Sequence, residues 1–370
     1  MRVAIAGTGS IARIHANALH KLGDQAEIVA AADIDEARLA AFCGKHRIPS
    51  AYRDLGNLLA KEQPGLVHLC TPPHLHHPQA LSCLEAGASV LVEKPPALSL
   101  AEFDEIAAAE GAPGPDNPDG TRGPWFATVF QHRFGSGHRR LRPLGLGGEL
   151  GRPLFAVCHT VWFRDQAYFD VPWRGRWETE GGGPTMGHGI HQMDMLADVL
   201  GDWAEVSAVA RQQARRMKTE DISLAHVTFA NGAVASVVNS VLSPREESYL
   251  RFDFERATVE LTHVYGYGDE DWRITPAPGF GPEVLAAWNP GNGDDAAPPD
   301  RSGHQAQFAA VLRSLREGRR PPVGPAESRR TLSLVTAIYA SAFTGRPVRP
   351  EDIAPGSPFY TRMDGPGARW

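Results

Sequence analysis

The first twelve residues limit the possible fold more than any other stretch of the chain. A short apolar run from Met1 to Ala6 leads into a glycine-rich turn, and apolar residues at helical spacing follow it. A strand, a GxGxxA turn and a helix in this order are typical of a βαβ unit that binds a dinucleotide. The turn consists of Gly7, Thr8, Gly9, Ser10, Ile11 and Ala12.

Single positions in and after this turn have separate physical roles. Gly7 permits the tight turn, and Gly9 lets the backbone approach a pyrophosphate whose charge the helix N-terminus stabilises. Ala12 keeps the helix close to the strand. Asp33 follows the second strand, at the spacing expected of an acid that binds the adenosine ribose. The alternative is that Asp33 serves only as a helix cap. An acid there repels a 2′-phosphate, so NAD is favoured over NADP unless basic neighbours override it.

Strands and helices alternate regularly as far as residue 134, which is where we place the domain boundary. Such alternation implies parallel strands with right-handed crossovers, so the predicted fold class is α/β with a doubly wound parallel sheet. Segment 111–124 is rich in Gly, Pro, Asp and Asn and is predicted to be an exposed insertion. Predicted strands cover 27–32, 50–52, 66–70, 88–92 and 125–130, and predicted helices cover 36–46, 55–61, 79–86 and 100–110.

Two strand ends in this half carry candidate site residues. One predicted strand is followed by Glu93-Lys94-Pro95, at the edge of the sheet where open α/β sheets bind ligands. Another is followed by a proline-rich stretch with three histidines, which we interpret as an extended turn over the dinucleotide. A metal site is disfavoured, because no further ligand at zinc spacing is evident. The expected cofactor contacts here are Thr71, Pro72, His74, His76, Glu93 and Lys94.

The second half of the chain has a different pattern. Alternating, β-branched segments between residues 153 and 274 predict a large, open and mostly antiparallel sheet in a second α/β domain, residues 135–370. Segment 276–301 is predicted to be a long loop. Helices are predicted over 305–316 and 327–344, and they can pack back on the first domain, residues 1–134.

A helix from Pro184 to a stop at Gly201 interrupts this sheet, after three glycines. One stripe of it is apolar and is expected to be its buried face. His188 and His191 point away from that stripe, either as solvated residues or as site residues. The stripe consists of Met186, Ile190, Met193, Ala197 and Leu200.

Composition narrows the classes of function. Charged residues make up 22% of the 370 residues and the net charge is −6, without long like-charge blocks, so neither nucleic acid nor an anionic membrane is an expected partner. The four cysteines lack CxxC spacing and are expected to be buried thiols. We expect no membrane span and no signal peptide, and therefore a cytoplasmic protein.

Taken together, these motifs make the sequence similar to the Gfo/Idh/MocA family of oxidoreductases, relatives of glucose-fructose oxidoreductase and inositol dehydrogenase. The resemblance covers nearly the whole chain, from the glycine turn and the Glu-Lys-Pro motif to the Gly-Ile-His of the second helix. It implies NAD(P)-dependent transfer of a hydride at a hydroxyl-bearing carbon of a sugar, inositol or related polyol. It also implies a homodimer or homotetramer that uses the second sheet.

The same resemblance implies that Lys94 and His191 are catalytic. Because the ordinary pKa of an imidazole is about 6.5, His191 is the better proton carrier at neutral pH, and Lys94 then serves as a charged donor to the substrate oxygen. The family commonly has an aspartate four residues before the histidine, where this chain has Gly187. His188 can replace it. The expected substrate contacts are Arg164, Trp173, Arg174, His188 and His191.

Two other functions remain open on the sequence alone. Some relatives oxidise a sugar transiently and so cleave glycosides without net redox change. Others bind the dinucleotide as sensors without catalysis, and the missing aspartate at Gly187 keeps that alternative open.

Overall fold

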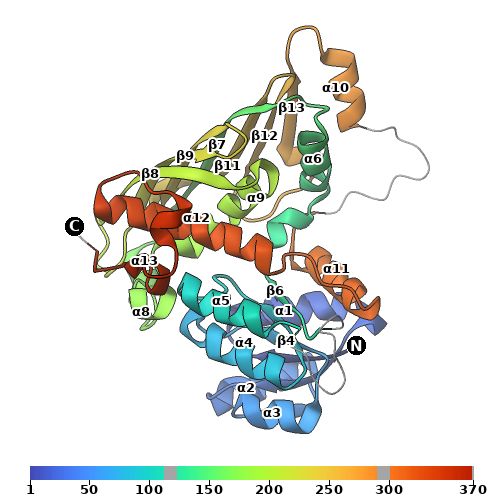
Figure 1. Cartoon of the computed structure of the whole chain (residues 1–370). Coiled ribbons are helices and arrows are strands. Elements are labelled where there is room, and N and C mark those ends of the chain that lie inside the picture. The colour runs from blue at the N-terminus through green and yellow to red at the C-terminus, as the bar shows by residue number, and fades with distance from the viewer. Residues whose placement is uncertain (112–122, 290–300, 369–370) are drawn as a thin grey trace. The chain divides into compact units, whose positions relative to one another are not determined.

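The computed structural model describes residues 1–111, 123–289 and 301–368 and divides the chain into two compact units (Figure 1). Unit 1 consists of Met1–Phe130 and His304–Arg329. Unit 2 consists of Gln131–Gly303 and Arg330–Trp370. The predicted insertion at 111–124 lies almost wholly outside the described residues.

Unit 1 is built on a six-stranded parallel sheet with the order β3-β2-β1-β4-β5-β6. The order reverses between β1 and β4, which is the point where doubly wound sheets bind dinucleotides. The predicted α/β parallel sheet is therefore confirmed. Its strands are β1 (Arg2–Ala6), β2 (Glu27–Ala32), β3 (Ser50–Tyr52), β4 (Leu66–Leu69), β5 (Ser89–Val92) and β6 (Phe126–Thr128).

Helices cover this sheet, and one of them comes from far along the sequence. Helix α11 (His304–Arg316) packs against α1 (Ser10–Lys21) and adds Phe308, Val311 and Leu312 to the core around β1 (Figure 1). The unit therefore needs residues from both ends of the chain. The other helices are α2 (Glu36–His46), α3 (Leu55–Glu62), α4 (His76–Glu85) and α5 (Leu100–Ala109), with short 3-10 turns η1 (Gly23–Gln25) and η2 (Pro73–Leu75).

The proline-rich stretch after β4 is helical, so the predicted extended turn is wrong. Residues Pro73–Leu75 form η2, and α4 begins at His76, three residues earlier than predicted. Pro73 and Pro78 are tolerated because both fall within first turns, where backbone N–H groups have no intrahelical acceptor.

Unit 2 contains a seven-stranded sheet with the order β13-β12-β11-β7-β10-β9-β8. Among the described strands of this second sheet only β7 and β10 pair in parallel, so the prediction of a mostly antiparallel sheet is confirmed. Its strands are β7 (Pro153–Phe163), β8 (Trp203–Arg211), β9 (Ile222–Phe229), β10 (Val234–Ser240), β11 (Leu242–Phe254), β12 (Ala257–His263) and β13 (Trp272–Pro276).

Burial alternates along these strands, so one face of the sheet is covered and the other is open. Along β9 every second residue is buried, and the intervening residues are partly or fully exposed. The open face carries apolar side chains, among them Phe155, Leu224 and Val234. Helix α9 (Ile190–Leu200) lies against β7 and β11 (Figure 1).

Among the described helices of unit 2 that were not predicted, the two longest are α6 (Ser136–Gly147) and α10 (Gly281–Trp288). Helix α6 contains an internal proline and several glycines, which disguise its helical pattern. Helix α10 lies within the predicted loop 276–301, whose residues 290–300 are outside the described part. The remaining elements are η3 (Gln131–Phe134), α7 (Gln166–Phe169), α8 (Trp177–Glu180), η4 (Thr185–Gly189), η5 (Asp269–Asp271), α12 (Pro325–Thr344, which crosses into unit 2 at Arg330), η6 (Pro350–Ile353) and α13 (Pro358–Thr361).

The predicted helix from Pro184 to Gly201 is present, but its first turn is a π-helix, η4, before α9 begins. Every residue of α9 is buried, so the single buried stripe that we predicted is wrong. A helix that is buried all round places polar residues inside the protein, where they need partners. Single π-turns inside helices are frequent at functional sites.

The cysteine prediction is confirmed, since Cys43, Cys70, Cys83 and Cys158 are all free and buried. In the described part of the chain, none of the helices has the length and apolar character needed to cross a membrane.

Candidate active site

The glycine turn of unit 1 has the geometry that a pyrophosphate needs. Gly7 has a φ of +84°, and a Cβ there would lie 2.7 Å from the carbonyl oxygen of Cys70, so only glycine fits. A Cβ on Gly9 would meet nothing within 4 Å. Gly9 is also the N-cap of α1, and no side chain among the described residues caps that helix end. The turn therefore offers open space beside unsatisfied helix N–H groups, which suits a diphosphate.

The first turn of α1 supplies the other predicted residues of this motif. Ser10 is exposed, and Ile11 packs against the edge of the core. Ala12 is fully buried, as expected for the position where helix and strand approach closely.

Asp33 lies at the end of β2 beside the glycine turn. Its carboxylate accepts hydrogen bonds from the backbone N–H and the hydroxyl of Thr8, at 2.8 and 2.7 Å. Arg38 donates to it from Nη2 at 2.6 Å and from Nε at 3.1 Å. Burial alone would raise the pKa of Asp33, but the bonds from Arg38, Asp35 and Thr8 outweigh it and lower the pKa to about 2. Asp33 is therefore an ionised acceptor beside the glycine turn, at the position where the acid of this motif typically binds the adenosine ribose.

The predicted contacts after β4 separate into exposed and buried groups. His74 is exposed, whereas Thr71 and Pro72 are half-buried. His76 is buried, with Nδ1 2.7 Å from the carbonyl oxygen of Pro95 and Nε2 2.9 Å from that of Thr71. It thus links the loop after β4 to the loop after β5, which carries Lys94.

Glu93 belongs to a buried cluster that the sequence did not indicate. His15 Nε2 donates to Glu93 Oε1 at 2.9 Å, and His304 Nε2 lies 3.6 Å from the same oxygen. Ligand atoms of the three residues lie within 4.8 Å of one another, a spacing that could also hold a metal ion. The 2.9 Å contact is itself a hydrogen bond, which accounts for the arrangement without a metal.

Two more titratable groups extend this cluster toward β4. His15 Nδ1 lies 2.9 Å from Nδ1 of His68 and 3.3 Å from Sγ of Cys70. Burial lowers the pKa of His15 and lowers that of His68 further, so both imidazoles are neutral at pH 7. For Glu93, burial opposes ionisation, but the bonds from His15 and His304 lower its pKa well below the usual value. Glu93 is therefore a buried anion directly before Lys94, which is itself half-buried.

In unit 2, His188 lies among the predicted substrate contacts. Its ring meets the edge of Trp162 at a centroid distance of 5.2 Å, and its Nε2 lies 3.4 Å from the hydroxyl of Tyr168. The guanidinium of Arg174 covers Tyr168 and Trp173, at 3.9 and 4.4 Å from the ring centroids, and donates to the Tyr168 hydroxyl.

Arg164 borders the same group of rings, which we call the aromatic wall: Trp162, Tyr168, Trp173 and Tyr265. Its guanidinium lies 5.2 Å from the Trp162 centroid and donates to Glu246 at 2.6 Å. The structure thus brings together Arg164, Trp173, Arg174 and His188. Trp177, in contrast, packs in the core against Tyr339 and Phe343.

His191 is stacked on a second imidazole, that of His132 from η3, with a centroid distance of 4.9 Å and an interplanar angle of 19°. Gln192 Nε2 donates to Nδ1 of His132 at 3.3 Å and to Nε2 of His263 at 3.0 Å. Burial lowers the pKa of His263 to about 4, which keeps that ring neutral. His132 lies just after the predicted strand 125–130, and nothing in the sequence assigned it a role.

A salt-bridge network anchors η3 to α9. Arg133 donates from Nε and Nη2 to Asp194, at 2.5 and 2.6 Å, and from Nη1 to Asp198 at 2.7 Å. All three residues are buried. His138 and Arg142 of α6 bind Asp198 as well, at 2.9 and 3.0 Å. Because His132 precedes Arg133, this network fixes the ring that stacks on His191.

The carboxylate of another residue, Glu180, lies beside Gly187. A Cβ on Gly187 would be 3.6 Å from Oε1 of Glu180, which is buried. Oε2 of Glu180 accepts the backbone N–H of Gly175 at 2.6 Å, and its Oε1 lies 3.4 Å from Arg174. Glu180 therefore supplies a buried carboxylate beside Gly187, the position at which the resemblance led us to expect an aspartate.

The start of the helix is held by another buried acid, Glu220. It accepts the backbone N–H groups of Gly183 and Thr185, at 3.0 and 3.1 Å, and the hydroxyl of Tyr339 at 2.9 Å. Burial raises the pKa of Glu220 to about 7, against the lowering effect of these bonds.

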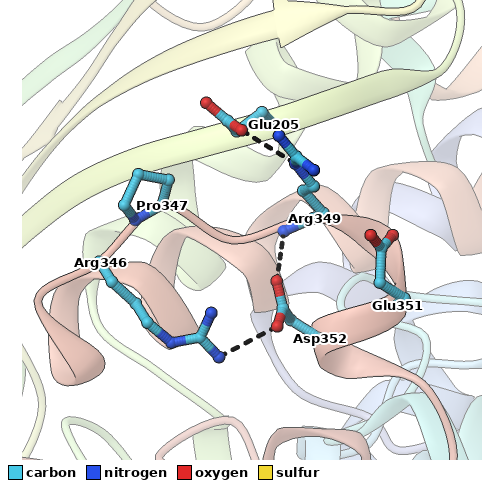
Figure 2. Close-up of a pocket in the computed structure, with 6 residues that line it drawn as sticks. All are labelled: Glu205, Arg346, Pro347, Arg349, Glu351 and Asp352. Atoms are coloured by element: carbon cyan, nitrogen blue, oxygen red, sulfur yellow. Dashed lines mark hydrogen bonds and ion pairs between the residues drawn. The ribbon is translucent and has the colours of Figure 1, made fainter.

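Unit 2 also has a surface hollow of about 400 Å³ that contains none of these residues (Figure 2). Its charges pair with one another: Arg349 binds Glu205, and Arg346 binds Asp352, both at 3.0 Å. We assign no function to it.

Comparison with known families identifies the chain. Residues 1–113 match a family model described as "Oxidoreductase family, NAD-binding Rossmann fold". Residues 138–262 match the "GFO/IDH/MocA C-terminal domain". The chain belongs to the GFO/IDH/MocA family. It is therefore an oxidoreductase with an NAD-binding Rossmann domain, which confirms the expected family and cofactor; the preference for NAD over NADP remains a prediction.

Individual relatives in this family include sugar dehydrogenases. D-glucoside 3-dehydrogenase of Escherichia coli (strain K12) is 29% identical over 72% of this chain and 78% of the relative. D-apiose dehydrogenase of Paraburkholderia graminis is 26% identical over 97% of this chain and 92% of the relative. The WlbA dehydrogenase of Bordetella pertussis, solved with NADH and UDP-GlcNAcA, has a TM-score of 0.78 at 25% identity, covering 94% and 98% of the two chains.

Proposed function

We propose that this oxidoreductase transfers a hydride between NAD and a hydroxyl-bearing carbon of a sugar, inositol or related polyol. The observation that carries the proposal is that two buried histidines, His188 of η4 and His191 of α9, each pack against another ring, the indole of Trp162 and the imidazole of His132 respectively. Flat aromatic faces and fixed donors are suited to a carbohydrate ring. The named activities of the relatives, on a glucoside and on apiose, agree with this class.

Each proposed residue has a defined part in the chemistry. When bound, NAD supplies the hydride acceptor. Removing a hydride from an alcohol carbon also requires a base for the hydroxyl proton and positive charge near the developing oxyanion. We assign proton transfer to His191 and stabilisation of the substrate oxygen to Lys94. His188, Arg164, Trp173 and Arg174 are assigned to substrate binding.

A substrate screen tests this assignment. The full chain would be incubated with NAD and a panel of hexoses, glycosides, inositols and uronic acids, and NADH formation would be followed by absorbance. Turnover with at least one member supports the proposal. Glycoside cleavage without NADH accumulation would instead favour the transient-oxidation mechanism, and cofactor binding with no turnover across the panel would favour a sensor.

Substitution of Lys94 then tests the residue roles. Lys94→Ala is expected to reduce turnover by about a thousandfold or more, because an electrostatic donor to the oxyanion is lost, while NADH affinity stays within about threefold. His191→Asn should remove proton transfer and flatten the pH profile of turnover. Near-normal turnover in the Lys94 variant would refute its role.

We further propose that unit 2 provides the substrate-binding and oligomerisation domain, and that the chain forms a homodimer or homotetramer through the open face of its sheet. Exposed apolar residues on that face, such as Phe155 and Val234, support this assembly. Light scattering of the wild type and of a Phe155→Glu/Val234→Glu variant tests it, since the double variant is expected to dissociate.

A further inference from the structure

The Glu93 cluster lies entirely within unit 1, at the carboxyl edge of the parallel sheet. Its members come from α1 (His15), β4 (His68), the end of β4 (Cys70), the end of β5 (Glu93) and the start of α11 (His304). None of these side chains serves the proposed hydride transfer directly. Burying so many titratable groups is costly unless they hydrogen-bond to one another. They do so here except at Nε2 of His68, which has no hydrogen-bond partner among the described residues.

The cluster contains one fixed negative charge. Glu93 is ionised, while His15 and His68 are held neutral by burial. The side chain of Glu93 is 8% exposed, and that of His304, the outermost member, is 14% exposed. A charge in such a site is screened much less than a surface charge, so its field extends over several ångströms.

The position of this charge follows from the topology. In a sheet of this order the dinucleotide crosses the carboxyl edge between β1 and β4, and the acid after β2 marks the adenosine side. Asp33 follows β2, so the nicotinamide half lies toward β4 and β5. Glu93 follows β5, and its carboxylate reaches His15 of α1, the helix that begins at the glycine turn.

We propose that the buried carboxylate of Glu93 makes the protein bind NAD⁺ in preference to NADH. The negative charge of the carboxylate stabilises the positive charge that the nicotinamide ring carries in NAD⁺ and lacks in NADH. Glu93 and Lys94 then have opposite electrostatic effects at one strand end. Lys94 disfavours a positive ring, and Glu93 offsets that effect. The carboxylate makes no bond to substrate and donates no proton, so its role is electrostatic.

Cofactor binding by the full chain tests this directly, without catalysis. The dissociation constants of NAD⁺ and NADH would be measured by calorimetric titration, in EDTA so that a metal in the cluster cannot contribute. In Glu93→Gln the ratio of the NAD⁺ constant to the NADH constant is expected to rise about tenfold, the order of effect for charges several ångströms apart in a partly buried site. A fraction of misfolded protein would affect the dissociation constants of NAD⁺ and NADH equally, so the ratio of the two constants would not change.

Two further variants separate charge from shape. Glu93→Asp keeps the negative charge and should leave the ratio within about threefold of the wild type. Glu110→Gln is the matched control: it also removes a carboxylate from unit 1, one that is 3% exposed, but at the opposite edge, where Glu110 binds the backbone N–H of Phe126 and Arg320. Its ratio should not change.

The proposal is overturned if Glu93→Gln weakens both cofactors equally, or if the aspartate variant behaves like the glutamine variant. Should Glu93→Gln not fold, His304→Lys decides the same question. It places a positive charge beside the carboxylate, so the negative charge of Glu93 is cancelled and the ratio should rise. An unchanged or lower ratio in that variant contradicts the proposal.

Discussion

Units 1 and 2 both bury carboxylates next to proposed catalytic residues, but they neutralise them differently. In unit 1, Glu93 is bonded by imidazoles, of which His15 is neutral at pH 7. In unit 2, Asp194 and Asp198 are bonded by the guanidinium of Arg133, which stays charged at any physiological pH. Hydrogen bonding to a neutral ring keeps a carboxylate ionised without cancelling its charge.

This difference indicates two uses of buried acids. A carboxylate whose charge remains uncancelled can act on a ligand at a distance, as we propose for Glu93. A carboxylate paired with arginine has little field left and is suited to hold elements in place, as Asp194 holds η3 against α9. The predictions below test this division, starting with the largest effect.

Loss of the arginine should damage unit 2 most. Arg133→Leu leaves Asp194 and Asp198 buried without their guanidinium, so the free energy of unfolding should fall by about 3–5 kcal/mol. Hydrogen exchange should increase in peptides from η3 and α9 and much less in peptides from unit 1. Unchanged exchange in α9 would show that the network does not anchor this helix.

Glu220 predicts a pH dependence of stability. Its pKa is raised to about 7 in the folded protein, above its value when unfolded, so between about pH 4.5 and 7 the folded state binds the extra proton. The contribution of Glu220 to stability is therefore full below about pH 4.5 and falls as pH rises to 7, by about 3 kcal/mol. Urea unfolding at pH 5 and pH 8 should show a larger difference for the wild type than for Glu220→Gln.

Substitutions at the two glycines of the turn should have different effects, one mainly on stability and the other mainly on NAD affinity. Gly7→Ala introduces a Cβ at positive φ and against the Cys70 carbonyl, so unit 1 should lose about 2 kcal/mol. Gly9→Ala meets open space and should cost less than about 1 kcal/mol, yet reduce NAD affinity at least tenfold because the pyrophosphate cannot approach. Equal NAD affinity in the Gly9 variant and the wild type would refute the assigned cofactor position.

The smallest effect is expected at the surface hollow of unit 2. Arg349 pairs there with Glu205, and its side chain is 62% exposed (Figure 2). Arg349→Ala should change the free energy of unfolding by less than about 1 kcal/mol, which makes it the exposed counterpart of the Arg133 variant. If Arg349→Ala lowered the free energy of unfolding as much as Arg133→Leu does, burial would not determine how strongly these arginine–carboxylate ion pairs stabilise the protein.

Local patterns in the sequence predicted the first unit well and the second less completely. Strands 27–32 and 50–52 and helix 36–46 end where predicted, because their apolar spacing and caps are strong. Helix α6 escaped prediction because Pro143 and its glycines lower helix propensity, and tertiary packing against α9 stabilises it.

The candidate site was predictable only where a motif carried it. Gly7, Asp33, Lys94 and His191 stand in recognisable patterns, whereas His15 and His304 meet at Glu93 only through the fold. His132 gave a weak signal by its place after β6. Glu180 gave none, because nothing local indicates that it reaches Gly187.

The interrupted path of unit 1 has a consequence for biosynthesis. Phe308 and its neighbours in α11 complete a core that begins at Val3, and they leave the ribosome only after all of β7 to β13. The nucleotide-binding unit therefore cannot finish folding before strands β7 to β13 of the other unit have been translated. Until then Glu93 lacks its partner His304, and a nascent chain arrested before residue 304 should hold dinucleotide poorly.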